Sequence, residues 1–391
     1  MNVPRSSPAV SGYKTMHSHS RKKTFLDLTV LILLLAVSAV VAQNMHAGQS
    51  QPSELSEQQI QIPNRASTPL FEGTPGKQRT EIYFDPATRT VTLKLLVQDP
   101  NGYFIPNIRR ENFVVYENGV RQQNVSVDVE HASVSLGVLV EFGGRTQALD
   151  RLMALEITRA GRQLEDVVER EDKVAVWKYA DKPEKLSDFS PAKETLDRVF
   201  TELGEPRFSE TNLYDAVIAV LQQLKPVKGR KAIILISSGI DTFSKAKFED
   251  ALRAARSSDT PIYVVGLTRV LRGLVEIHEN SGTLAHIDWG KVDRELQEIA
   301  RASGGRVYSP ETTLDLSQIY DDMMENLRVR YVIRYRSSSN LDLNSPRTVR
   351  VELVDPKTGD PLEIVDQSGH KIRANVVVQD TYVPSAVSAK P

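Results

Sequence analysis

The chain has 391 residues, of which 40% are hydrophobic and 25% are charged, so it is long enough for two or three domains with their own cores. Its 49 Lys and Arg residues balance 50 Asp and Glu residues, and this near-neutral charge gives no reason to expect nucleic acid as a partner. The lack of cysteine in the sequence excludes disulfides, thiolate nucleophiles and Cys-ligated zinc.

Residues 1–42 have the profile of an export signal. A basic stretch at 21–23 precedes an apolar run over 28–41, and the small residues Ala39 and Ala42 fit a cleavage site. The run is shorter than the roughly 20 residues that cross a bilayer comfortably, so we favour cleavage. The alternative is an uncleaved anchor over residues 28–42, the one route by which we expect the chain to contact a membrane. Both interpretations predict an exported protein that is secreted, periplasmic or in the cell envelope.

Two β-rich segments flank the middle of the chain. Residues 43–79 are polar and predict a disordered linker, whereas residues 80–131 alternate with the period of two that favours strands. The dipeptide Asn118-Gly119 in that second segment is a strong hairpin signal. Residues 329–391 return to the same β pattern. Each β segment has too few strands to be stable alone, so we expect the two to join in one β-sandwich.

Residues 132–328 alternate between apolar strands and amphipathic helices. The run 134–142 is almost continuously apolar, as in a strand buried on both faces, and the helix after it places its apolar residues at helical spacing. This alternation predicts an α/β domain with a doubly wound, mostly parallel sheet. The stretch 268–290 is long for a loop in such a domain, so it is either a functional insertion or a partly helical excursion.

Several motifs in order resemble the von Willebrand factor A domain (VWFA). The segments that carry the resemblance are Ser135–Glu141, Glu171–Trp177, Ser209–Ala216, Lys231–Gly239 and Ile299–Gly305. More narrowly, the chain is similar to the VWFA-related proteins common in acidobacteria, in which a β segment precedes the A domain. The turn 99–102 and the segment 113–119, which ends in Glu-Asn-Gly, match that preceding segment.

The resemblance implies a metal-ion-dependent adhesion site (MIDAS), in which oxygen ligands hold Mg²⁺. Here the first loop places Glu141 where the family has Asp, Gly143 in place of one serine and Arg145 in place of the other. Ser238 replaces the usual carboxylate of the later loop. Thr211 and Glu141 are the remaining candidate metal ligands, whereas Asp241 lies in the later loop but does not match a ligand position. We therefore expect a degenerate site with no metal and no other cofactor.

The expectation of a site without metal rests mainly on Arg145, because a guanidinium stays charged in proteins and repels Mg²⁺. One interpretation is that Arg145 pairs with Glu141 or Asp241 and replaces the ion with a salt bridge. The other is that Arg145 lies exposed on its loop and has no role shared with Glu141.

The sequence shows no catalytic constellation. Metalloprotease, nucleophile-elbow and phosphate-loop spacings are missing from the sequence, Ser238 has no nearby histidine in the sequence, and His278 and His286 fit solvated loop residues. We therefore expect a protein that is not an enzyme and that binds a protein or peptide through the carboxyl ends of its strands. That predicted contact surface comprises Glu141, Gly143, Arg145, Thr211, Ser238 and Asp241. The alternative is a structural cell-envelope component in which the A domain is a spacer.

Overall fold

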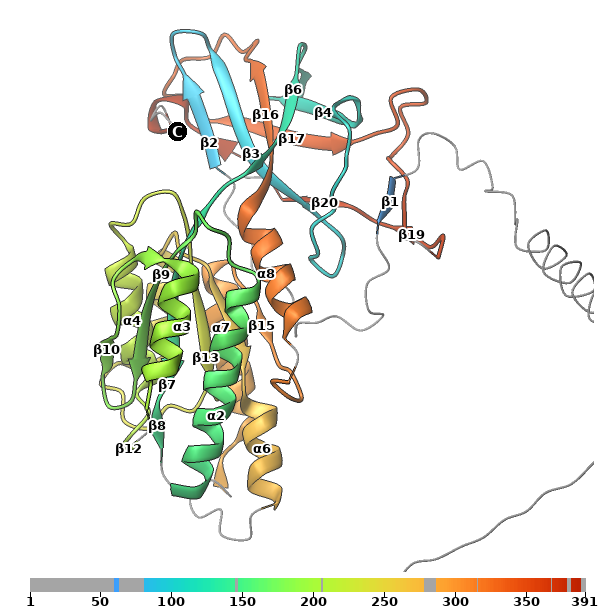
Figure 1. Ribbon diagram of the computed structural model, residues 1–391. Helices are drawn as coiled ribbons and strands as arrows, with labels where there is room; N and C mark the ends of the chain where they lie inside the picture. The colour runs from blue at the N-terminus through green and yellow to red at the C-terminus, as the bar shows by residue number, and fades with distance from the viewer. Residues whose placement is uncertain are drawn as a thin grey trace, which may run out of the picture. The chain divides into compact units, whose positions relative to one another are not determined.

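The computed structural model describes residues 60–62, 81–144, 147–204, 207–277, 286–314, 316–366, 368–377 and 381–387. The predicted leader over residues 1–42 lies outside the described residues. In the described part of the chain, an α/β unit is flanked in sequence by strands that form a separate β unit (Figure 1). None of the described helices is long and apolar enough to cross a membrane.

The α/β unit is built on a seven-stranded sheet with the order β10-β9-β7-β13-β14-β15, and β11 also pairs with β9. Its four inner pairings are all parallel, and only β10 and β11 join antiparallel. The predicted doubly wound, mostly parallel sheet is confirmed. The strands are β7 (Val134–Glu141), β9 (Lys173–Tyr179), β10 (Pro183–Lys185), β11 (Ser190–Pro191), β13 (Arg230–Ser237), β14 (Ile262–Gly266) and β15 (Val307–Tyr308).

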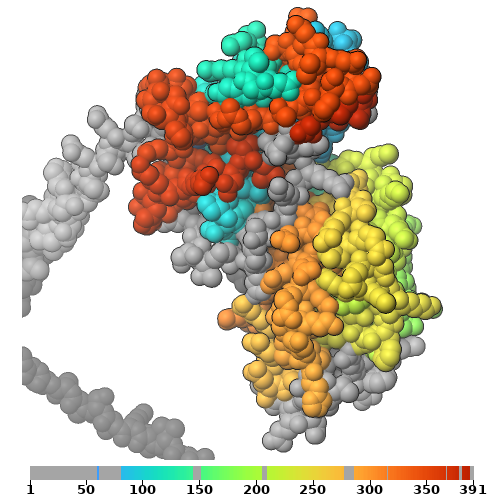
Figure 2. Space-filling model, turned by 180° about the vertical axis from the view of Figure 1, so that it is seen from behind, coloured from blue at the N-terminus to red at the C-terminus, as the bar shows by residue number. Residues whose placement is uncertain are grey.

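Helices cover both faces of this sheet because each buries one apolar stripe. One core cluster gathers apolar side chains of α2 (Gln147–Gln163), α3 (Ala192–Glu202), α6 (Thr268–Ile277) and α8 (Ser317–Arg328). The other cluster gathers those of α4 (Leu213–Leu224), α5 (Phe248–Ser257) and α7 (Trp289–Ser303). Figure 2 shows α5 in yellow and α7 in orange on the face opposite to the view of Figure 1.

Most of the described part of the stretch 268–290 is helical, because α6 covers Thr268–Ile277 and α7 begins at Trp289. Helix α6 buries Leu271, and Val270 and Leu274 pack against the same core, which fixes the segment to the domain. Residues 278–285, including His278, lie outside the described residues. His286 is exposed, and the described residues contain no group of three or more His, Cys, Asp or Glu side chains that could hold a metal.

The two β segments pair with each other as expected. One sheet has the order β2-β3-β16-β6, with β20 also on β3, and the other has the order β21-β17-β4-β5. Thus β16 from the C-terminal segment lies between two strands of the N-terminal segment. The strands are β2 (Glu81–Asp85), β3 (Thr90–Gln98), β4 (Phe113–Glu117), β5 (Val120–Arg121), β6 (Ser126–His131), β16 (Val329–Arg336), β17 (Arg347–Leu353), β20 (Asn375–Val377) and β21 (Thr381–Tyr382).

One part of the predicted linker is a strand. Within residues 43–79, β1 (Ile60–Ile62) pairs in parallel with β18 (Ile364–Asp366), which also pairs with β19 (Lys371–Ile372). The Ile60 side chain is buried in the β unit's core. The polar composition of the linker hid this short apolar alternation, so the expectation of disorder is wrong for these three residues. The rest of the linker lies outside the described residues.

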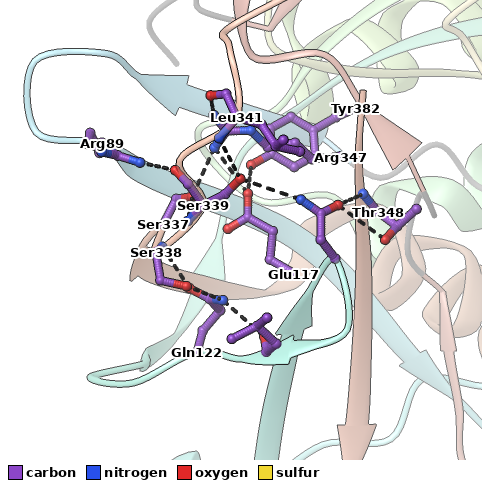
Figure 3. A network of polar contacts seen from close by, with 12 residues as sticks. Arg89, Glu117, Gln122, Ser337, Ser338, Ser339, Leu341, Arg347, Thr348 and Tyr382 are labelled. Carbon is purple, nitrogen blue, oxygen red and sulfur yellow. Dashed lines mark hydrogen bonds and ion pairs between the residues drawn. The ribbon is translucent and has the colours of Figure 1, made fainter. Parts of the chain in front are cut away.

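A buried ion pair connects the strands of the second sheet (Figure 3). Arg347 donates to the Glu117 carboxylate at 3.2 Å, to the Ser337 hydroxyl at 2.9 Å and to the Leu341 carbonyl at 3.0 Å. Tyr382 donates to the same Glu117 oxygen at 2.8 Å. Glu117 belongs to the Glu-Asn-Gly motif, so the motif joins β4, β17 and β21 at one point.

The α/β unit and the β unit are joined by backbone and side chains. Helix α8 ends at Arg328 and β16 begins at Val329, without an intervening loop. Arg306 pairs with Asp322 of α8 at 3.0 Å and donates to the carbonyl of Gly102, in the predicted turn 99–102. This turn therefore contacts the α/β unit through a buried arginine.

We expect Arg347→Ala to lower the free energy of unfolding by about 3–5 kcal/mol, because it leaves the buried Glu117 carboxylate without its cation. Urea unfolding monitored by circular dichroism measures the loss. The matched control is Arg350→Ala, which removes an exposed arginine from the same strand and should change stability by about 0–1 kcal/mol. Equal effects of the two substitutions would contradict the structural role of Arg347.

Candidate functional site

The predicted contact surface lies at the carboxyl ends of β7 and β13. Glu141 ends β7, and Ser238 directly follows β13. Thr211 precedes α4 and lies next to Gly143, whose strand β8 (Gly143–Gly144) pairs in parallel with β12 (Arg207–Phe208). We call the loops 141–144, 207–212 and 238–247 the crest.

The Glu141 carboxylate points into the protein. One oxygen accepts hydrogen bonds from the backbone N–H of Ser238 at 2.7 Å and from the Ser237 hydroxyl at 2.9 Å. The Ser238 hydroxyl donates to the other oxygen at 2.9 Å. Tyr179 lies 3.3 Å from the carboxylate and 2.7 Å from the Ser237 hydroxyl. Glu141 thus ties together the ends of β7, β9 and β13.

Burial is the largest influence on the pKa values of Glu141 and Tyr179. Loss of solvent raises the pKa of Glu141, and the hydrogen bonds from Ser238, Ser237 and Tyr179 oppose that rise. The pKa of Tyr179 is also well above its ordinary value, first because the phenol is buried and second because the Glu141 charge is close. Ser238 is fully buried and its hydroxyl is held by Glu141, so its oxygen is not presented at the surface.

Gly143 packs closely against the neighbouring loop of the crest. A Cβ atom at this position would lie 2.6 Å from the carbonyl oxygen of Glu210 and 2.8 Å from the methyl group of Thr211. The side chain that the family carries here therefore has no space. The absence of a side chain at Gly143 permits this close contact, and β8 pairs with β12 at the same place.

Thr211 and Asp241 are near this packing, but neither forms a hydrogen bond with Glu141. The Thr211 hydroxyl is buried without a hydrogen-bond partner among the described residues. Asp241 instead accepts the backbone N–H of Tyr214 at 3.1 Å, at the start of α4, and the hydroxyl of Ser244. The carboxylate in the later loop thus caps a helix.

Arg145 lies outside the described residues. Both interpretations of that residue, a salt bridge to Glu141 or Asp241 and an exposed position, therefore stay predictions.

The side-chain oxygens at the described positions do not fit a Mg²⁺ site. A hard divalent cation needs several oxygen ligands with lone pairs turned toward it. Both Glu141 oxygens already accept hydrogen bonds, the Ser238 hydroxyl donates inward, and Gly143 has no side chain. Among the buried side-chain oxygens of the described crest residues, the Thr211 hydroxyl alone lacks a hydrogen-bond partner. One neutral hydroxyl is far short of a coordination shell.

The loop after β13 presents an aromatic side chain that sequence reasoning did not single out. Phe243 is 72% exposed, although its backbone N–H donates to the Asn212 side chain at 3.1 Å. Thr242 on one side exchanges hydrogen bonds with Thr211, and Asp215 accepts the backbone N–H groups of Lys245 and Ala246 on the other, both at 2.9 Å. The available signal was a lone phenylalanine in an otherwise polar loop.

Comparison with protein families identifies the α/β unit. Residues 152–322 match the model of the von Willebrand factor type A domain. The sheet order and the helices on both faces agree with that match, and β7, which carries Glu141, precedes the matched residues. The chain therefore contains a von Willebrand factor type A domain. A search of curated proteins found no match.

Solved structures that match part of this chain include three from bacteria. An aerotolerance-related membrane protein from Bacteroides fragilis is 16% identical with a TM-score of 0.35, and the match covers 50% of this chain and 100% of that one. The conserved hypothetical protein BatB from Bacteroides thetaiotaomicron has 16% identity, a TM-score of 0.37 and the same coverages. A von Willebrand factor type A protein from Catenulispora acidiphila is 12% identical with a TM-score of 0.40, and the match covers 71% and 74% of the two chains.

We expect Glu141→Gln to become increasingly stable relative to the parent as the pH rises. Because the folded state raises the pKa of Glu141 above the unfolded value of about 4.3, the folded protein binds this proton more tightly. The contribution of Glu141 to the parent's free energy of unfolding is greatest when the pH is below the pKa of Glu141 in the unfolded state. It falls as the pH rises toward the pKa of Glu141 in the folded state. Urea unfolding across this range measures the difference, with Glu249→Gln on the exposed face of α5 as the control. A difference that shrinks with rising pH would contradict the burial argument.

We expect Gly143→Ser to lower the free energy of unfolding by about 1–3 kcal/mol, because the new Cβ collides with backbone atoms of Glu210. Thermal unfolding measures the effect. Gly273→Ser is the matched control, since a Cβ at that position meets no atom within 4 Å. If the first substitution is as well tolerated as the second, the crest is more open than the contacts indicate.

Proposed function

We propose that this protein is an exported, non-enzymatic interaction module whose crest binds a protein or peptide partner without a metal ion. The main support for this proposal is the solvent exposure of the Phe243 side chain. A large apolar side chain in water gains free energy when a partner covers it, and the gain is greatest when its backbone is already held in place. The hydrogen bonds that backbone N–H groups of this loop donate to the side chains of Asn212 and Asp215 supply that preorganisation.

The chemistry of the crest supports a metal-free contact. Glu141 has its carboxylate turned toward Ser237 and Ser238, so it offers no free charge to an ion at the surface. Lys245 and Lys247 are exposed beside Phe243. The partner that suits this surface has an apolar hollow for the aromatic ring and acidic side chains around it.

Two further parts of the proposal come from the sequence. Export depends on the predicted signal in residues 1–42. The absence of catalytic function rests on the missing catalytic spacings in the sequence, and the burial of Ser238 agrees with it.

We expect Phe243→Ser to abolish partner capture while leaving stability within about 0.5 kcal/mol of the parent, because an exposed side chain contributes little to folding. The immobilised protein is incubated with cell-envelope extract in buffer with EDTA and in buffer with Mg²⁺, and the retained proteins are quantified by mass spectrometry. Proteins retained by the parent should be lost with the variant and unaffected by EDTA.

Leu314→Ser is the matched control, since Leu314 is 71% exposed and lies in the loop held against Gln163 at the other end of α2. Capture that survives Phe243→Ser but is lost with EDTA would overturn the proposal. Capture indifferent to every crest substitution would favour the alternative of a structural envelope component with the A domain as a spacer.

A further inference from the structure

Strand β6 forms an open edge of the β unit's first sheet (Figure 1). Among the described strands it pairs with β16 alone. An edge strand carries unpaired backbone N–H and C=O groups and is a template for a further strand, unless it is covered or blocked. The question is therefore which groups of β6 face outward and what lies beside them.

The register with β16 shows which backbone groups of β6 face outward. The N–H of Ala132 donates to the carbonyl of Arg328, and the pairing continues from there with His131 opposite Val329. In an antiparallel pair, residues alternate between those bonded to the partner and those whose backbone groups point away. The even-numbered residues of β6 therefore bond to β16, and the odd-numbered Val127 and Val129 point outward. Neither has another backbone hydrogen bond to a described residue.

The side chains of β6 differ between the two faces of the sheet. On one face, Asp128 pairs with Arg334 at 2.6 Å, and Glu130 pairs with Lys94 at 2.9 Å. On the other face lie Val127, which packs against the core, and Val129, which is 60% exposed. Charged side chains on or beside an edge strand normally protect it from further pairing. Here Asp128 and Glu130 lie on the face opposite Val129, and on the face of Val129 the end of the strand carries His131, which contacts Glu169 at 3.1 Å.

A polar hollow adjoins the start of this edge. It has a volume of about 400 Å³, and its lining includes Arg110, Arg121, Gln123 and Val125, together with Glu111. The Nε group of Arg110 donates to the outward carbonyl of Val125 at 2.9 Å, so its guanidinium lies where an added strand would continue past Val127. Two arginines against one glutamate favour an anionic group in the hollow.

We propose that the β6 edge binds an extended peptide by strand addition, with a carboxylate-bearing residue of the peptide in the hollow at Arg110 and Arg121. The backbone of the peptide pairs with Val127 and Val129, and one of its apolar side chains covers Val129. Successive side chains on one face of a strand are two residues apart, so the acidic residue lies two positions beyond the residue that faces Val127. This surface is separate from the crest.

The test uses the fluorescein-labelled probe peptide Ser-Val-Thr-Val-Thr-Asp and the full-length protein. Antiparallel to β6, this peptide places its two valines over Val129 and Val127 and its aspartate in the hollow. We expect saturable binding by fluorescence anisotropy, and slower hydrogen exchange at the amides of Val127 and Val129. A peptide with lysine in place of aspartate should bind at least tenfold more weakly.

Two kinds of variant distinguish the contribution of backbone pairing to peptide binding from the contribution of the arginine charges. Val129→Pro removes the outward N–H and leaves the bonds to β16 in place, because those are made by the even-numbered residues. Val129→Thr keeps the N–H and is its matched control. We expect at least tenfold weaker binding for Val129→Pro, and the same for Arg110→Gln combined with Arg121→Gln, which does not alter the strand.

Three results would overturn the proposal. The first is no binding or protection at millimolar probe. The second is binding that is equal for the parent, Val129→Pro and the double arginine variant. The third is protection of Val127 and Val129 that rises with protein concentration in the absence of peptide, which would identify a second copy of this chain as the occupant.

Discussion

The buried carboxylate of Glu141 is the constraint on which the crest depends. It receives hydrogen bonds from Ser237, Ser238 and Tyr179, and so it holds three neighbouring strand ends together. A buried carboxylate is costly unless its oxygens are satisfied, and this arrangement satisfies both. Because those oxygens face inward, the Glu141 carboxylate is not presented at the surface of the crest, where the Phe243 side chain is exposed.

The α/β unit that contains the crest continues directly into the β unit. Helix α8 passes directly into β16, and Arg306 connects α8 to the turn that ends at Gly102. Within the β unit, the Arg347–Glu117 pair holds the second sheet. The two proposed contact surfaces, the crest and the β6 edge, therefore belong to separately stabilised sheets, so each can be altered without removing the other.

The sequence was sufficient for the sheet type, the helix order and the pairing of the two β segments, because apolar continuity and alternation report burial directly. The sequence also led to the prediction that Glu141, Gly143 and Ser238 depart from the family pattern. It could not show that Glu141 bonds to Ser238, or that Gly143 lies against Glu210, because these contacts join residues far apart in the chain. The strand at Ile60 and the exposure of Phe243 likewise depend on tertiary packing.

The most direct test of the account is calorimetric titration of Mg²⁺ and of Mn²⁺ into the purified protein. The inward hydrogen bonds of Glu141 and the close packing at Gly143 predict no saturable heat of binding for either ion. Tight, saturable binding of either ion, lost with Thr211→Ala, would contradict the account. It would mean that the carboxylate turns outward and that a metal-bridged acidic partner is the ligand of the crest.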